Sequence, residues 1–255
     1  MLVAVLLLSA LACGSGGGDL VATTENPGDV VETTVAAGTA QVGISYDMAA
    51  ARADAARQIE DLGLEPRRDL AELIPDRQFE GTVDLAAQRI HLVSPADGTA
   101  DGTTLELYVD RTRAYSRRGD EGWRYRELGS VAGESGWEQA SPAAALAVLA
   151  GSRPLELLGA DEVRGSPVTH YRTTSGTEDD QDTVEVWVDE AGRAVRIRTT
   201  PQSPAETTAF GAAEGGGASL SSRVGLQGAA STTDFWDFGV AFDVTAPVGA
   251  VPDEP

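Results

Sequence analysis

From residue 79 to the end of the chain, short segments in which apolar and polar residues alternate follow one another, separated by turn residues. Such alternation is typical of a half-buried β-strand, because successive side chains of a strand point to opposite faces of the sheet. Short turns between the segments favour antiparallel pairing, since parallel strands need long crossover connections. With one earlier segment of the same kind, the predicted strands are 38–46, 79–85, 88–93, 103–109, 113–117, 123–125, 168–173, 183–188, 194–198, 219–226 and 235–244.

Few segments have the period of a helix. Asn26 as N-cap, followed by Pro27, predicts a first helix that ends near residue 37. Residues 49–76 and 141–151 carry apolar stripes that predict further helices. A sheet of about eleven strands must curl or close to protect its edges. We therefore expect an α+β fold, in which one large, curved, mostly antiparallel sheet forms a half-barrel and helices cover its concave face.

The front of the chain predicts export. Residues 2–8 are all apolar and residues 9–12 are mostly small. This run has the length of a signal-peptide core and is shorter than the roughly 20 residues that a membrane-spanning helix needs. The segment Ser9-Ala10-Leu11-Ala12-Cys13 resembles the lipobox of bacterial lipoproteins, in which the cysteine is acylated and becomes the new N-terminus. We therefore expect a lipoprotein signal peptide at 1–12, lipidation of Cys13 and a flexible tether over 13–26.

The alternative is that Cys13 is a stray thiol in an ordinary secretory signal. Three features favour the lipobox: Cys13 ends the apolar run, it is the only cysteine, and a glycine-rich segment follows at 14–18. Signal peptides also carry positive charge before the apolar core. None precedes the core here, so we expect the natural start to lie further upstream.

Composition excludes several classes of function. The chain has 19 basic residues against 40 acidic ones, a formal charge of −21, and every basic residue is arginine. Such a surface repels phosphate backbones and anionic headgroups, so nucleic acid is not an expected partner. Membrane contact must then come from acyl chains attached at the N-terminus. A lone cysteine also excludes a disulfide framework and a multi-thiolate zinc site.

Six groups of short motifs are spread along the chain. They are 34–40 (TVAAGTA), 79–85 (FEGTVDL) with Arg89-Ile90, 115–117 (YSR) with Gly122-Trp123, 165–171 (GSPVTHY), 186–189 (VWVD) with Gly192-Arg193 and Arg196, and 237–239 (DFG) with Ala246-Pro247. Together they resemble one lipoprotein family, the actinobacterial LppX/LprG-type lipoproteins, whose fold is similar to that of the carrier LolA. The resemblance implies a half-barrel over 27–255, a single domain whose apolar cavity holds acyl chains of envelope lipids or lipoglycans. The predicted helical stretch 49–76 is longer than its equivalent in the family.

Signatures of catalysis are absent from the sequence. His91 and His170 each fall within a predicted strand, where a histidine is more often a surface or structural residue than a catalytic one. No G-x-S-x-G elbow, Walker loop or H-E-x-x-H zinc motif occurs. The acidic run 178–182 lacks the spacing of a calcium loop, so an acidic turn is the better interpretation. We therefore expect neither an enzyme, nor a metal, nor a cofactor.

Two functions remain. The first is a protein of the cell membrane, lipid-anchored on its extracytoplasmic face, that binds and transports acyl chains of a lipid or lipoglycan in an apolar cavity. The candidate cavity walls are Ile59, Leu62, Leu146 and Leu149, for which ordinary packing between helix and sheet is the alternative. The second function is a membrane-anchored protein-binding or sensory module without lipid cargo. An open apolar cavity favours the first function, and a filled core favours the second.

Overall fold

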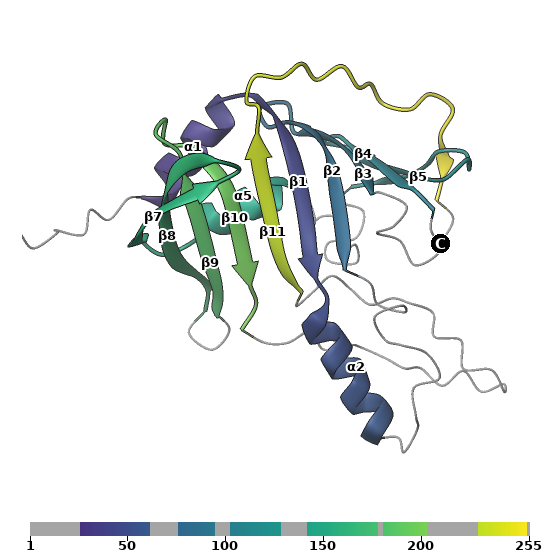
Figure 1. The fold of residues 1–255 in the computed structure, drawn as a ribbon. Coiled ribbons are helices and arrows are strands. Elements are labelled where there is room, and N and C mark those ends of the chain that lie inside the picture. Colours follow the sequence, from purple (N-terminus) through teal and green to yellow (C-terminus); the bar gives the residue numbers. More distant parts are fainter. Residues whose placement is uncertain are drawn as a thin grey trace, which may run out of the picture.

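The computed structural model describes residues 26–61, 76–94, 103–128, 142–177, 181–202 and 229–253. Within these ranges lie three helices and one twelve-stranded sheet (Figure 1). The helices are α1 (Pro27–Ala36), α2 (Ala49–Asp61) and α5 (Pro142–Ala150). The strands are β1 (Thr39–Asp47), β2 (Arg77–Asp84), β3 (Arg89–Ser94), β4 (Leu105–Val109), β5 (Arg113–Arg118), β6 (Arg124–Glu127), β7 (Glu156–Val163), β8 (Ser166–Gly176), β9 (Gln181–Val188), β10 (Ala194–Thr200), β11 (Ala230–Trp236) and β12 (Val251–Pro252).

The sheet is open, curved and almost entirely antiparallel, which confirms the predicted half-barrel of an α+β fold. Its strand order is β12-β6-β5-β4-β3-β2-β1-β11-β10-β9-β8-β7. Strands that follow one another along the chain pair with each other from β1 to β6 and from β7 to β11. Strand β1 also pairs with β11 and so joins these two halves of the sheet. The pair β12–β6 is parallel.

Local sequence accounts for the first two elements. The Asn26 side chain accepts a hydrogen bond from the backbone N–H of Gly28 (3.1 Å), which caps α1, and Pro27 occupies its first turn. Along β1, every second side chain is buried, namely Ala40, Val42, Ile44 and Tyr46. This alternation assigns one face of the sheet to the core, as the sequence predicted.

The helices cover one half of the concave face. Helices α1 and α5 pack on each other and on β10. The hydroxyl of Thr34 in α1 accepts a hydrogen bond from the backbone N–H of Ala194 (2.8 Å), and both residues are fully buried. Figure 1 shows α2 differently placed, because it continues from the end of β1 and projects away from the sheet. Of the helices in the described ranges, none is long and apolar enough to cross a membrane.

One predicted strand needs correction, and two strands of the sheet were not predicted. The strand predicted over 235–244 is wrong, because β11 ends at Trp236 and the chain turns at Asp237 (φ 48°) and Gly239 (φ 86°). From there the chain runs to the other edge of the sheet, where β12 pairs with β6 (Figure 1). Strand β12, with only two residues, has no periodicity to detect. Strand β7 was missed as well, since most of its side chains are exposed and its sequence ELLGADEV does not alternate between apolar and polar residues.

Other predictions fall outside the described residues. These are the strand over 219–226, the helical stretch after Asp61, and the cap Ser141.

Candidate functional site

The concave face of β2 to β5 forms an apolar surface in the half of the sheet opposite to α1 and α5. Cross-strand pairing aligns its side chains in rows, since residues opposite each other point to the same face. One row runs through Val83, Ile90, Val109 and Ala114, and the next through Gly81, Leu92, Leu107 and Ser116. The larger apolar members are buried or half-buried. Four adjacent strands thus present one continuous apolar floor.

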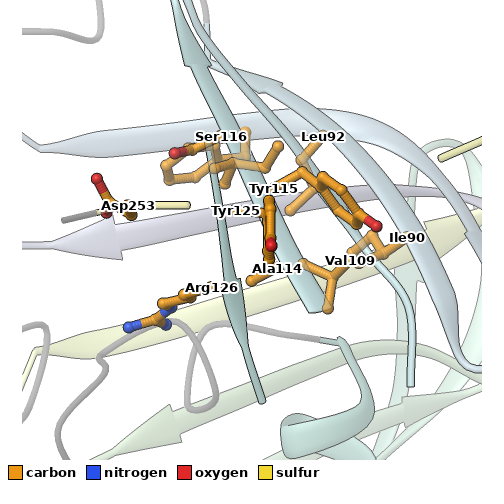
Figure 2. A pocket seen from close by; sticks show the side chains of 11 residues that line it. Ile90, Leu92, Val109, Ala114, Tyr115, Ser116, Tyr125, Arg126 and Asp253 are labelled. Atoms are coloured by element: carbon orange, nitrogen blue, oxygen red, sulfur yellow. The ribbon is translucent and has the colours of Figure 1, made fainter. Parts of the chain in front are cut away.

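A pocket of about 70 Å³ opens on this floor. Figure 2 shows Ile90, Leu92 and Val109 on one side of it, with Arg126 and Asp253 on the other. The volume is small beside the several hundred Å³ of a drug-sized binding site. It is larger than the space that one water needs, so it can take a short apolar group. The lining residues are Phe79, Ile90, Leu92, Leu107, Val109, Ala114, Tyr115, Ser116, Tyr125, Arg126 and Asp253.

The polar side of the pocket is formed by the last strands of the sheet. Arg126 belongs to β6, and Asp253 directly follows β12. Backbone hydrogen bonds hold β12 there, from Val251 N–H to Trp123 C=O (3.0 Å) and from Asp253 N–H to Tyr125 C=O (2.7 Å). The C-terminal segment therefore supplies one wall of the pocket.

An ion-paired cluster on the opposite face ties the same strands together. Glu106 of β4 accepts hydrogen bonds from Arg117 of β5, and its carboxylate lies 2.8 Å from His91 Nε2 of β3. Burial acts to raise the pKa of Glu106, but the bonds to His91 and Arg117 outweigh it and the pKa is lowered. The carboxylate is therefore ionised at neutral pH and links three strands behind the pocket.

A second hollow, of about 330 Å³, lies on the convex face. Its residues Ser45 and Asp47 alternate along β1 with the buried Ile44 and Tyr46, so they point to the opposite side of the sheet. Unlike the first pocket, it is mostly polar. The lining residues are Ser45, Asp47, Trp187, Arg196, Arg198, Ala230 and Thr232.

Paired side chains surround this convex hollow. Arg196 donates two hydrogen bonds to Asp234 (2.6 and 2.9 Å), and Trp187 Nε1 donates one to Asp161 (2.8 Å), which lowers the pKa of that carboxyl. The His170 ring stacks on Trp187, with ring centroids 4.1 Å apart. His170 and Trp187 thus contribute to a packed surface cluster. Within the described ranges, no three His, Cys, Asp or Glu side chains gather closely enough to hold a metal ion.

Comparison with known proteins finds likeness at the level of structure. No family model matches the chain, and no curated protein matches it. Among solved structures, lipoprotein LppX of Mycobacterium tuberculosis matches 87% of this chain and 100% of its own at 11% identity, with a TM-score of 0.44. LprF of Mycobacterium bovis matches 88% of this chain and 95% of its own at 12% identity, with a TM-score of 0.45.

A third match is a putative outer membrane lipoprotein-sorting protein domain of Vibrio parahaemolyticus, at 11% identity over 85% of this chain and 95% of that one, with a TM-score of 0.29. LppX and LprF are thus structural neighbours of the chain, as the motif resemblance predicted. The likeness concerns the fold alone.

Two of the four residues predicted as cavity walls, Leu146 and Leu149, are not among the described residues that line the concave pocket. Leu146 and Leu149 of α5 are buried in the main core cluster, in the other half of the sheet. Ile59 lies in α2, while Leu62 and Cys13 lie outside the described residues.

Most of the pocket residues belong to strands whose alternation was recognised, whereas Arg126 lies beyond the predicted strand 123–125 and Asp253 follows β12, which was missed. Alternation marks every inward residue equally, so it does not reveal where along the floor a pocket forms.

Proposed function

We propose that the chain is an envelope lipoprotein that binds an acyl chain on the concave face of β2 to β5. The observation that supports this function is the apolar floor with its pocket, lined by Phe79, Ile90, Leu92, Leu107 and Val109. Burial of an apolar chain is favourable in proportion to the area removed from water and needs no directional partner. A pocket whose floor is almost entirely hydrocarbon therefore suits an acyl chain better than a polar metabolite.

The size of the pocket limits what enters without rearrangement. About 70 Å³ suffices for the end of a chain, so the rest of the ligand must lie along the floor or widen the site. Strand β12 is a natural place for such widening, because it is held to β6 through only two paired residues. Short strand pairs with exposed hydrogen bonds are among the parts of a fold that open at low cost.

Filling the pocket tests this function. In Ala114→Leu, the added carbons would occupy the void beside Val109, so we expect uptake of a fluorescent fatty-acid probe to weaken at least about tenfold, or 1.4 kcal/mol. The melting temperature should stay constant or rise, because filling a void adds contacts.

Ala147→Leu is the matched control, since Ala147 is exposed on α5, remote from the pocket. It should bind the probe as the unchanged protein does. Equal uptake by Ala114→Leu and the control would show that the acyl chain does not occupy this pocket.

The anchor is a separate part of the proposal. Acylation of Cys13, with removal of residues 1–12, would hold the domain at the extracytoplasmic face of the cell membrane through the tether 13–26. Stable attachment needs two or more acyl chains, at about 0.8 kcal/mol per buried methylene. The position of Cys13 at the end of the apolar run supports this arrangement.

Replacing the cysteine tests the anchor. We expect Cys13→Ser to move the protein from the membrane fraction to the soluble fraction, or to leave it uncleaved and larger on a gel. Mass spectrometry of the native N-terminus should show a diacylglyceryl group on Cys13. An unmodified thiol, together with membrane attachment that survives Cys13→Ser, would contradict lipidation.

A second function is supported by the convex hollow. Its volume of about 330 Å³ exceeds that of the concave pocket, and its lining of arginine, carboxylate and hydroxyl groups suits polar side chains of a partner protein. A protein-binding or sensory role would use this face and leave the concave pocket empty.

A further inference from the structure

The chain beyond β11 forms an arm that runs from one half of the sheet to the edge of the other half (Figure 1). Within this arm, residues 244–252 read VTAPVGAVP and include no charged residue. We call residues 244–252 the uncharged loop. The loop stands out in a chain of which 23% of the residues are charged. It has no charge of its own through which to bind a charged partner.

The uncharged loop exposes apolar side chains to water. Val248 is 99% exposed and Val251 is 53% exposed. Among the described residues, one other large apolar side chain is exposed, that of Leu158 in β7, at 39%. The chain turns at residues 248 and 249, where Gly249 adopts a left-handed backbone conformation (φ 80°). A single exposed apolar residue is ordinary, whereas two close together on one short loop mark a candidate contact surface.

The fold holds the uncharged loop at both of its ends. On one side, the guanidinium carbon of Arg89 lies 4.8 Å from the centre of the Phe242 ring. On the other side, β12 pairs with β6, and Asp253, which directly follows the loop, lines the concave pocket. The exposed valines are therefore fixed in position, and the end of the loop lies next to the pocket.

A lipid bilayer is the partner that fits the uncharged loop. A stable protein interface buries on the order of 1,000 Å² or more, which two valine side chains cannot supply. A bilayer requires no matching surface, since apolar side chains gain free energy when they leave water for lipid. The formal charge of −21 on the chain opposes contact with anionic headgroups. The domain therefore approaches a membrane most easily where its own surface carries no charge.

We propose that the uncharged loop inserts Val248 and Val251 into the bilayer that carries the lipid anchor, and that this contact holds the pocket next to the lipid from which it is loaded. The inference rests on the proposed function and adds the surface with which the domain meets the membrane. Attachment through the N-terminus raises the effective concentration of the loop at the bilayer, so a weak contact is sufficient. Asp243 and Asp253 are exposed at the borders of the loop and limit the depth of insertion, because a carboxylate in lipid is costly.

The first test measures how deeply residue 248 lies in the membrane. The full chain, purified in its membrane-attached form, carries Val248→Cys labelled with an NBD fluorophore. It is reconstituted in phosphatidylcholine vesicles that contain a doxyl-labelled phosphatidylcholine as quencher. Leu158→Cys with the same label is the matched control, since it replaces an exposed apolar residue on β7. We expect quenching at position 248 to exceed that at 158 at least about threefold, because inserted apolar groups reach about 5–10 Å into the boundary between headgroups and acyl chains.

The second test measures the consequence for loading with Val248→Asp. Because Val248 is almost fully exposed, this change should leave the fold intact. We expect transfer of a fluorescent fatty-acid probe from the vesicles to the anchored protein to slow about tenfold, since a charge replaces an apolar contact. Uptake of the probe from vesicle-free solution, measured on the full chain with Cys13→Ser, should stay the same. Leu158→Asp should change neither rate.

Equal quenching at positions 248 and 158 would overturn insertion of the uncharged loop. Equal transfer rates for Val248→Asp and Leu158→Asp would overturn its role in loading. Protein that does not float with the vesicles would overturn the anchor and the docking together. If the protein with an unchanged loop takes up no probe from solution, the proposed acyl-binding function is wrong, while the quenching result still decides whether the loop inserts.

Discussion

Gly81→Ala is expected to destabilise the fold by about 3 kcal/mol, since overpacking a tight contact typically costs 1–3 kcal/mol and sometimes more. Gly81 lies in β2 opposite Leu92 of β3. A methyl group on Gly81 would lie 1.9 Å from the backbone oxygen of His91 and 2.8 Å from its carbonyl carbon. These are backbone atoms of a paired strand, so the clash is relieved only if β2 and β3 move apart. Urea denaturation would measure the loss in free energy of unfolding.

Gly122→Ala is the matched control for that experiment. Gly122 has no atom within 4 Å of an added methyl group, and its backbone is not in the left-handed region. We expect unchanged or slightly raised stability, because alanine lowers the entropy of the unfolded chain by about 0.4–1 kcal/mol. Similar midpoints for the two variants would mean that β2 and β3 do not approach as closely as the structure has them. Because Gly81 lies in β2 opposite the pocket residue Leu92, its variant should also lose the acyl probe.

Leu149→Gln is the second change with a large expected effect, a loss of about 3–5 kcal/mol. Leu149 is 0% exposed and belongs to the main core cluster, between α5 and the sheet. The substitution removes hydrocarbon contacts and places an amide where the native side chain is fully enclosed. Thermal and urea unfolding would both measure the loss.

Ala147→Gln introduces the same side chain at an exposed position of the same helix. It should cost no more than about 0.5 kcal/mol, the difference in helix propensity. If Leu149→Gln instead unfolds at the same temperature as Ala147→Gln and loses an acyl ligand, then Leu149 lines a cavity, as the sequence hypothesis has it. The two variants therefore decide between core and cavity wall for α5.

The alternation of side chains was sufficient to predict most of the sheet. Strand β1 illustrates this, because its four inward residues could be assigned before any partner strand was known. The start of α1 could be predicted from two residues, because Asn26 caps the helix and Pro27 stands in its first turn. In both cases the physical cause is local, so a short window of sequence contains it.

The order of strands and the position of the pocket have non-local causes. Strand β1 pairs with β11, which follows it by more than 180 positions, and no local pattern specifies that pairing. In the resulting sheet, α1 and α5 pack on β10. The sequence prediction placed cavity walls on helices, whereas the described residues that line the concave pocket lie on strands, apart from Asp253. Arg126 of the pocket escaped notice because the face that it shares with Ala114 depends on the register of β5 and β6.

The two ends of the sheet differ in a way that bears on self-association. At one end, β12 covers the backbone of β6. At the other end, β7 is the edge strand among the described residues and pairs with β8, so its outer backbone groups form a template on which a second chain could add a strand. Exposed carboxylates at Glu156, Asp161 and Glu162 and a bulge between Leu157 and Gly159 interrupt that template. Two copies that meet at their β7 edges would bring these like charges together. We therefore expect that a high concentration of the protein does not cause the sheets of two copies to pair.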